Sequence, residues 1–386
     1  MELERIATNT YDFETIRKTG ITYVDKTGLM YPLVNTSMGN QFFLSRPRRF
    51  GKSLLLSTLQ KLFEGRRDLF QGLAIDSLPW DWSATYPVIR LDMSLCSGET
   101  VGEVEGRVVA TMRSEADRLG VALRNEDDAA ICLQSFIEDA AALAPCGQIV
   151  LLVDEYDKPL THWVGSEKVR PFQAFLKSFY AVIKKTGSMQ RFCLMTGVSK
   201  FSKVSIFSDL NNLTDLTMNP AATTLLGYTH EEVRKNYPMR LASLANQLGV
   251  DVDGAFTQLV SMYDGYCFDE RMVRVFNPVS LGSALRDMQL KSYWFETGTP
   301  AWLMTYAKKA PMDMDSLTVG DADLGTFEPA DPSMPAVLLQ TGYLTIKGVW
   351  GQGMGTVYDL GFPNEEVSAG FNRLTHNVGA WVSEGL

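Results

Sequence analysis

The stretch QFFLSRPRRFGKSLLLSTLQKLF, residues 41–63, decides the fold of this chain. It begins with the apolar run FFL at 42–44 and continues into a polar loop that ends in GKS at 51–53. Leucines and Phe63 then follow at helical spacing. This order predicts a β-strand, a tight loop and an α-helix.

A unit of this kind is suited to binding phosphate. The first amides of a helix have no partner within the helix, and together with the helix dipole they attract an anion. Lys52 would neutralise the phosphate oxygens, and the Ser53 hydroxyl would be a ligand of Mg²⁺. The usual pattern, G-x-x-x-x-G-K-S/T, has a glycine where this chain has Arg46. The sequence therefore predicts a nucleotide site with a modified phosphate loop; the alternative is a surface turn with a chance Gly-Lys-Ser.

The composition is that of a globular protein large enough for two or three domains, with 386 residues of which 45% are hydrophobic. A net charge of -9 argues against a surface built throughout for nucleic acid or anionic membrane, although residues 46–52 form a local basic patch. An N-terminus without an apolar signal segment, and no long apolar run elsewhere, predict a cytoplasmic protein with no membrane contact. The five cysteines are scattered without paired spacing, which predicts reduced thiols and no metal site among them. They are Cys96, Cys132, Cys146, Cys193 and Cys267.

Further strands and helices alternate after the phosphate loop. The β-branched apolar run at 86–93 predicts a second strand, and 191–198 predicts another buried strand. Between them, the spacing of apolar residues predicts helices over 101–120, 124–144 and 167–185. This alternation is typical of an α/β protein with a parallel sheet.

Two acids close the most apolar run of the chain. Residues 149–153 are too continuously apolar for a half-exposed strand, which indicates a central strand of a parallel sheet ending in Asp154-Glu155. Ligands of open α/β sheets bind at the carboxyl ends of the strands, so we expect Asp154 to hold Mg²⁺ and Glu155 to orient and deprotonate the attacking water. Thr196, at the end of the strand 191–198, either bonds the water or the terminal phosphate, or only closes a turn. For the two acids, the alternative is a cap on the following turn.

Two other polar segments have no single interpretation. Tyr23, Asp25 and Lys26 either lie beside a bound base or cover the edge of the sheet. Lys200 and Lys203 either approach the phosphate or belong to a solvated loop.

The second half of the chain has a different character. Thr229 and Glu232 form a T-x-x-E capping box that opens a helical region rich in aromatic residues. Residues 310–332 are acidic and contain Gly and Pro, which predicts a linker. Residues 333–386 show helix, β-hairpin and helix, a pattern typical of a winged-helix-like module. Because this hairpin has few basic residues, we expect it to pack on protein, and DNA binding is the weaker alternative.

Seven segments together point to one family: YVDKT at 23–27, RPRRFGKS at 46–53, LVDEYDKP at 152–159, TGVSKFSKVSIFSDLNNL at 196–213, YDGY at 263–266, FNPVSL at 276–281 and FPNEEV at 362–367. They resemble the predicted AAA-ATPase-like proteins of bacteria, over nearly the whole chain. In that family an arginine at the position of Arg46 is normal. The resemblance implies ATP as the nucleotide and a P-loop ATPase core with an extra strand between the phosphate loop and the acid-bearing strand.

The chain departs from the family in one respect. Members usually continue past the FPNEEV segment into a nuclease-like domain of the PD-(D/E)XK type. No strand-borne set of two acids and a lysine follows residue 367, so nuclease activity is not assigned. We expect either a natural short form or a truncated chain.

The expected fold class is α/β, a three-layer P-loop NTPase of the AAA/STAND-like type. The core would occupy residues 1–225, a helical lid-like domain 226–315, and a winged-helix-like module with the start of a truncated region 316–386. The leading hypothesis is a Mg²⁺-dependent ATPase that binds ATP and ADP and whose nucleotide state rearranges the domains. The alternative is a nucleotide-gated regulatory or scaffold protein with little turnover, and association with DNA is a third. A protein partner or a homo-oligomer is expected as well.

The expected site combines the loop and the strand ends. Catalysis is assigned to Asp154, Glu155 and Thr196, and the metal to Ser53 and Asp154. The nucleotide is assigned to Arg46, Arg48, Arg49, Phe50, Gly51, Lys52, Ser53 and Leu54. Since Pro47 offers no amide, the loop arginines either compensate for the missing donors with charge or pair with acids of the same domain.

Overall fold

The computed structural model describes residues 3–7, 10–201, 212–294, 317–351 and 353–382, with the backbone alone at 321, 322, 354 and 374–382. A five-stranded parallel sheet lies at its centre, in the order β2, β3, β4, β1, β5. The strands are β1 (Gln41–Ser45), β2 (Val88–Asp92), β3 (Ile149–Asp154), β4 (Gln190–Gly197) and β5 (Thr214–Asp215). β4 therefore separates the strand before the phosphate loop from the acid-bearing strand, as the family resemblance implies.

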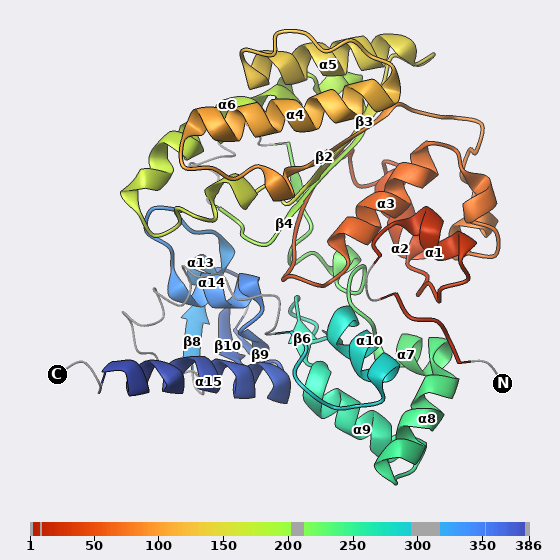
Figure 1. Ribbon diagram of the computed structural model, residues 1–386, viewed down its shortest axis with the longest axis vertical. Helices are drawn as coiled ribbons and strands as arrows, with labels where there is room; N and C mark the ends of the chain where they lie inside the picture. Colours follow the sequence, from red (N-terminus) through yellow and green to blue (C-terminus); the bar gives the residue numbers. More distant parts are fainter. Residues whose placement is uncertain (1–2, 8–9, 202–211, 295–316, 352, 383–386) are drawn as a thin grey trace.

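Helices cover the sheet on both sides (Figure 1). α1 (Phe13–Lys18), α2 (Thr27–Val34) and α3 (Lys52–Phe63) lie on one side, and α4 (Val101–Leu119), α5 (Ala129–Leu143) and α6 (Arg170–Lys185) lie on the other. Every residue of β1 and β3 is buried, which agrees with their continuous apolar sequences. The three-layer α/β core predicted from the sequence is thus present.

A group of helices follows the sheet and has an apolar core of its own. It contains α7 (His230–Asn236), α8 (Pro238–Leu248), α9 (Val252–Tyr263), α10 (Pro278–Asp287) and a short hairpin of β6 (Tyr266–Cys267) with β7 (Arg274–Val275). The predicted capping box is confirmed, because Thr229 accepts from the Glu232 amide and the Glu232 carboxylate accepts from the Thr229 amide. This opening of α7 agrees with the local sequence signal.

The last part of the chain, residues 317–382, is called the C-terminal module below. It contains β8 (Leu317–Gly320), α13 (Asp321–Gly325), α14 (Met334–Thr341), β9 (Thr345–Trp350), β10 (Val357–Gly361) and α15 (Glu365–Val382). Its antiparallel sheet has the order β8, β10, β9. The prediction of a linker over 310–332 is wrong for 317–325, since β8 pairs with β10 and α13 follows it. The hairpin and flanking helices are present, while the winged-helix assignment and the domain boundaries stay predictions.

Short 3-10 helices occur in the connections, at Arg67–Leu69, Ala74–Ser77, Met93–Leu95, Lys158–Leu160, Glu167–Val169, Gly187–Met189, Pro220–Ala222 and Gly353–Gly355. All five cysteines are free thiols, and only Cys146 among them is exposed. In the described part of the chain, none of the helices has the length and apolar character needed to cross a bilayer.

Candidate nucleotide-binding site

The phosphate loop connects β1 to α3 and is closed by its own lysine. Gly51, just before α3, has a φ of 92°, a left-handed conformation that favours glycine, and Arg49 has a φ of 71°. Lys52 is buried, and its ammonium donates to the carbonyls of Arg46 (2.8 Å) and Pro47 (2.9 Å). These bonds join the two ends of the loop, so the amides at the start of α3 and the lysine lie on one compact turn.

The charge of Lys52 is set by its surroundings. Burial lowers the pKa of Lys52 to about 8, and the nearby carboxylates of Asp154, Glu155 and Asp157 oppose that shift. The ammonium is therefore largely charged at pH 7 but poorly solvated. A cation in this state gains more from an incoming anion than an exposed lysine does.

Arg46, which replaces the first glycine of the usual pattern, is buried and hydrogen-bonded to the backbone. Its side chain is 1% exposed, and the guanidinium donates to the backbone carbonyls of Ser45 (2.9 Å), Thr217 (2.6 Å) and Ala222 (3.1 Å). It also lies 4.3 Å from the centroid of the Phe268 ring. The sequence left two alternatives for the loop arginines, compensation for missing donors by charge or pairing with acids. Arg46 instead makes its hydrogen bonds to backbone carbonyls. Arg46 ties the base of the loop to distant segments.

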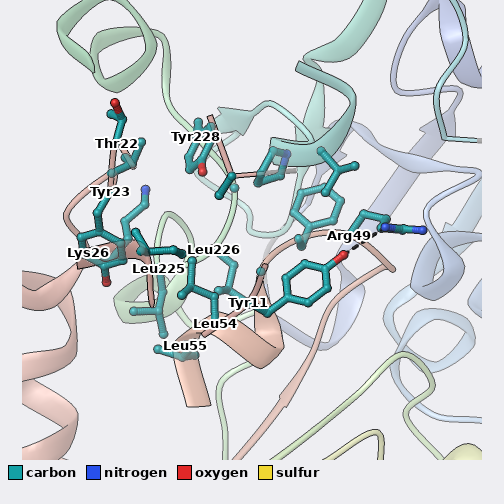
Figure 2. Close-up of a pocket in the computed structure, with 18 of the residues that line it drawn as sticks. Tyr11, Thr22, Tyr23, Lys26, Arg49, Leu54, Leu55, Leu225, Leu226 and Tyr228 are labelled. Carbon is teal, nitrogen blue, oxygen red and sulfur yellow. Dashed lines mark hydrogen bonds between the residues drawn. The ribbon is translucent and has the colours of Figure 1, made fainter. Parts of the chain in front are cut away.

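The remaining predicted loop residues lie around the same turn. The Arg49 guanidinium donates to the Tyr11 hydroxyl at 3.0 Å (Figure 2). Arg48 is half-buried, and so are Ser53 and Leu54 in the first turn of α3. The loop thus carries two cations besides Lys52 that are within reach of solvent.

The predicted catalytic residues come together at the carboxyl ends of two neighbouring strands. Asp154 ends β3 and is 2% exposed, and its Oδ1 accepts from the Thr196 hydroxyl (2.8 Å) and from the Glu155 amide (3.0 Å). Thr196 lies on β4, which pairs with β3 in parallel. Its hydroxyl donates to the Asp154 carboxylate, and its predicted contact with water or the terminal phosphate stays a prediction.

Glu155 has an unusual backbone conformation. Its φ is 50°, which is uncommon for a residue with a side chain and is found preferentially at functional sites. Burial raises the pKa of Glu155, the Asp157 carboxylate raises it further, and Lys52 opposes the shift. A carboxylate with a raised pKa beside a buried lysine fits a proton acceptor.

A pocket of about 730 Å³ that is open to solvent adjoins the phosphate loop. Figure 2 shows Tyr23 and Lys26 on one side of it and Leu54 and Leu225 on another. Its lining comes from four parts of the chain: the N-terminal segment, the loop with α3, the segment before α7, and the start of α10. It includes Tyr11, Thr22, Tyr23, Lys26, Arg49, Phe50, Gly51, Leu54, Leu55, Leu225, Leu226, Tyr228, Pro278 and Val279. Tyr23 and Lys26 line this pocket, and a position beside a bound base stays a prediction for them. Asp25 instead accepts from the backbone amides of Thr27 and Ala74.

Comparison with known proteins shows the family of the chain. Residues 7–207 match the family model described as "Predicted AAA-ATPase". The chain belongs to this predicted AAA-ATPase family. A protein of Azotobacter chroococcum mcd 1, described as "Uncharacterized protein in vnfD 5'region", is 37% identical over 355 residues, which are 91% of this chain and 66% of that protein. This chain therefore spans just under two thirds of that relative's length.

The residues present fit the Mg²⁺ that such a family implies. Within the described ranges, no group of three or more His, Cys, Asp or Glu side chains is arranged to hold a metal without help. Mg²⁺ rarely needs one, because it takes one or two carboxylates together with water and substrate phosphates. The Asp154 carboxylate and the Ser53 hydroxyl are oxygen donors of the kind that this hard ion prefers.

No individual role was predicted from the sequence for Tyr156 and Asp157, which follow the two predicted catalytic acids. The Asp157 carboxylate accepts from the amides of Ser199 (2.7 Å) and Val198 (3.3 Å), and the Tyr156 hydroxyl donates to the Ser199 carbonyl (2.8 Å). Gly197 leaves room for them, since a Cβ there would lie 2.5 Å from the Tyr156 ring. The DEYD segment at 154–157 contains a third acid, Asp157, that could have been noticed in the sequence. Roles were predicted only for the first two acids, because they stand at the end of the predicted strand.

Lys200 lines a second, smaller pocket together with Arg46 and Pro47, at the start of the loop. Its ammonium pairs with Asp215 of β5, at 2.5 Å. Lys203 lies outside the described residues.

Proposed function

We propose that this predicted AAA-ATPase binds ATP with Mg²⁺ and hydrolyses it. The observation that carries the proposal is the meeting of Lys52, Asp154, Glu155 and Thr196 beside the first turn of α3. Three of them belong to β3, β4 and the turn after β3, and the fourth begins α3. Phosphate, metal and water would thus meet at one edge of the sheet.

Each residue has one role in the proposal. The amides of the loop and the ammonium of Lys52 would bind the β- and γ-phosphates, exchanging the Arg46 and Pro47 carbonyls for phosphate oxygens. Ser53 and Asp154 would hold Mg²⁺, which when bound neutralises charge on the phosphates. Thr196 would orient Asp154, and Glu155 would accept the proton of the attacking water. Arg48 and Arg49 are candidates for additional phosphate contacts; Arg46 is not, because its donors serve backbone carbonyls.

The pocket beside the loop supports a nucleotide as the ligand. It shares Arg49, Phe50, Gly51 and Leu54 with the loop and α3, so a ligand with phosphates on the loop would place its nucleoside there. Most of the lining is apolar or aromatic, which suits a flat base. The choice of adenine is inferred from the family.

The loop also contacts the parts of the chain that would respond to nucleotide. Phe50 packs edge-on against Tyr266 and Phe268 of the helical region. In the C-terminal module, a Cβ at Gly342 would lie 2.8 Å from the Cβ of Pro47. A shift of the loop on binding would therefore move both regions. These contacts equally fit the alternative of a nucleotide-gated scaffold with little turnover, and partners are not assigned.

Turnover and binding measured separately test the proposal. We expect the wild-type chain to bind ATP by calorimetry and to release phosphate in the presence of Mg²⁺. Glu155→Gln should keep ATP affinity and lose release, and Lys52→Ala should weaken binding at least about tenfold, the loss of a charge-assisted contact. Lys61→Ala, at the far end of α3 and paired with Glu14 and Glu64, is the matched control.

The outcomes separate the two functions. ATP binding by the wild type without phosphate release would refute the enzyme and leave the scaffold. No binding of ATP by the wild type would refute both.

A further inference from the structure

The last two residues of β4 and the segment that follows them, residues 196–201, are called the β4 exit below, and this exit starts at the proposed catalytic centre. Thr196 holds Asp154 through its hydroxyl at 2.8 Å, and both side chains are almost fully buried. The position of the exit therefore determines where this hydroxyl points. Anything that moves the exit would move the Asp154 carboxylate or leave it without its donor.

Two side chains that follow β3 in the sequence are hydrogen-bonded to the backbone of the exit. The Asp157 carboxylate accepts from the Ser199 and Val198 amides, and the Tyr156 hydroxyl donates to the Ser199 carbonyl. Tyr156 is fully buried, and Asp157 is 3% exposed. Since both follow Asp154 and Glu155 directly in the sequence, the acids and the exit form one hydrogen-bonded unit.

The other end of this unit is bonded to the C-terminal module. The Lys200 amide donates to Oε1 of Gln340 on α14 (2.6 Å), and the Lys200 carbonyl accepts from the Phe327 amide (3.4 Å). The rings of Phe201 and Phe327 pack edge-to-face with centroids 5.3 Å apart. Both backbone groups of Lys200 are thus bonded to a segment more than 120 residues later in the chain.

Gln340 is well placed to fix the exit. It is 7% exposed, and its amide nitrogen donates to the carbonyl of Gly325, so the side chain is held at both ends. Without the Gln340 oxygen, the half-buried Lys200 amide would lose its acceptor, which costs more than a surface hydrogen bond.

We propose that Gln340 is a positioning residue for the Asp154–Thr196 pair, through which the C-terminal module regulates turnover at the nucleotide site. The inference rests on the proposed function. Because coupling between two sites is reciprocal, a partner or domain that displaces α14 changes the catalytic pair, and nucleotide binding changes the docking of α14. Gln340 contacts neither nucleotide nor metal in this account, and its effect reaches the site only through the β4 exit.

The test replaces Gln340 by methionine, which keeps the length of the side chain and removes both the acceptor of the Lys200 amide and the donor to the Gly325 carbonyl. Thr341→Val is the matched control, because Thr341 is the next residue of α14, is equally buried at 7% exposed, and donates only within its own helix. In Gln340→Met we expect kcat to fall about 5- to 30-fold, the range of one buried hydrogen bond, because of the two bonds lost only the one to the Lys200 amide leads to the catalytic pair. The Kd for ATP should change less than about 3-fold, since phosphate loop and pocket are untouched.

Two results would overturn the proposal. One is equal kcat for Gln340→Met and Thr341→Val; the other is a parallel loss of kcat and ATP affinity with a lowered melting temperature in Gln340→Met, which indicates a merely structural role.

Hydrogen exchange without nucleotide keeps the inference testable if the chain proves not to be an ATPase. In Gln340→Met, peptides covering 196–200 and 152–158 should both exchange at least about 5-fold faster than in Thr341→Val. Faster exchange at 198–200 with 152–158 unchanged would show that the module does not reach the acids. If the chain binds no ATP but both peptides exchange faster in Gln340→Met, the proposed ATPase function is refuted and the coupling between Gln340 and the acids is retained.

Discussion

A buried ion pair between Lys26 and Glu232 joins the N-terminal segment to the start of α7. The Lys26 ammonium lies 2.6 Å from both carboxylate oxygens of Glu232 and donates to the Thr224 carbonyl at 2.8 Å. Burial lowers the pKa of Lys26, and the Glu232 carboxylate opposes the shift. Lys26 also lines the pocket beside the phosphate loop.

We expect Lys26→Met to destabilise the docking of α7 by about 2–3 kcal/mol. Removal of one partner from a fully buried pair typically costs about 3–5 kcal/mol, because the other charge is left unpaired. Here the Glu232 side chain is 22% exposed and still accepts from the Thr229 amide, which reduces the cost. The control is Lys18→Met, which removes a Lys–Glu pair whose lysine is 59% exposed and should cost about 0–0.5 kcal/mol.

Hydrogen exchange of the amides in α7 and α8 measures this local free energy. A cost of about 2–3 kcal/mol corresponds to exchange that is roughly 30- to 150-fold faster, and Lys18→Met should leave it unchanged. In a double-mutant cycle, Lys26→Met with Glu232→Gln should cost less than the sum of the single changes. Exchange in Lys26→Met within 3-fold of the control, or additive single effects, would refute the reasoning.

Two further predictions concern buried polar groups. Thr196→Val removes the hydroxyl donor to Asp154 while keeping the shape of the side chain. It should lower kcat about 10- to 100-fold, as expected for a hydrogen bond to a charged group, and leave the ATP affinity nearly constant. Equal turnover in the variant and the wild type would contradict this prediction. For Glu366, burial raises the pKa above its ordinary value of 4.5, so the folded chain retains this proton to higher pH than the unfolded chain does. Glu366→Gln should therefore gain stability relative to the wild type as pH rises from 4.5 to 8 in urea unfolding, and a gap independent of pH would disprove the assignment.

Local patterns predicted the elements that form the site. The apolar runs before Gly51-Lys52-Ser53 and before Asp154-Glu155 became β1 and β3, because strand and helix signals depend on residues close in sequence. The capping box at Thr229 was found for the same reason. Short strands were missed: β8 has four residues within an acidic stretch and is stabilised by pairing with β10.

By itself, the sequence determined the α/β core, the phosphate loop and the acids at the end of a central strand, since each follows from periodicity or from a short motif. The tertiary structure decided how these parts are held. Arg46 bonds to carbonyls more than 170 residues away, and Gln340 of α14 supports Lys200 across 140 residues. Such partners are brought together only when the separate chain segments pack, and desolvation then makes each unpaired polar group costly. For that reason Arg46, which looked like a defect in the sequence, is held in the folded chain by three backbone carbonyls through its two terminal nitrogens.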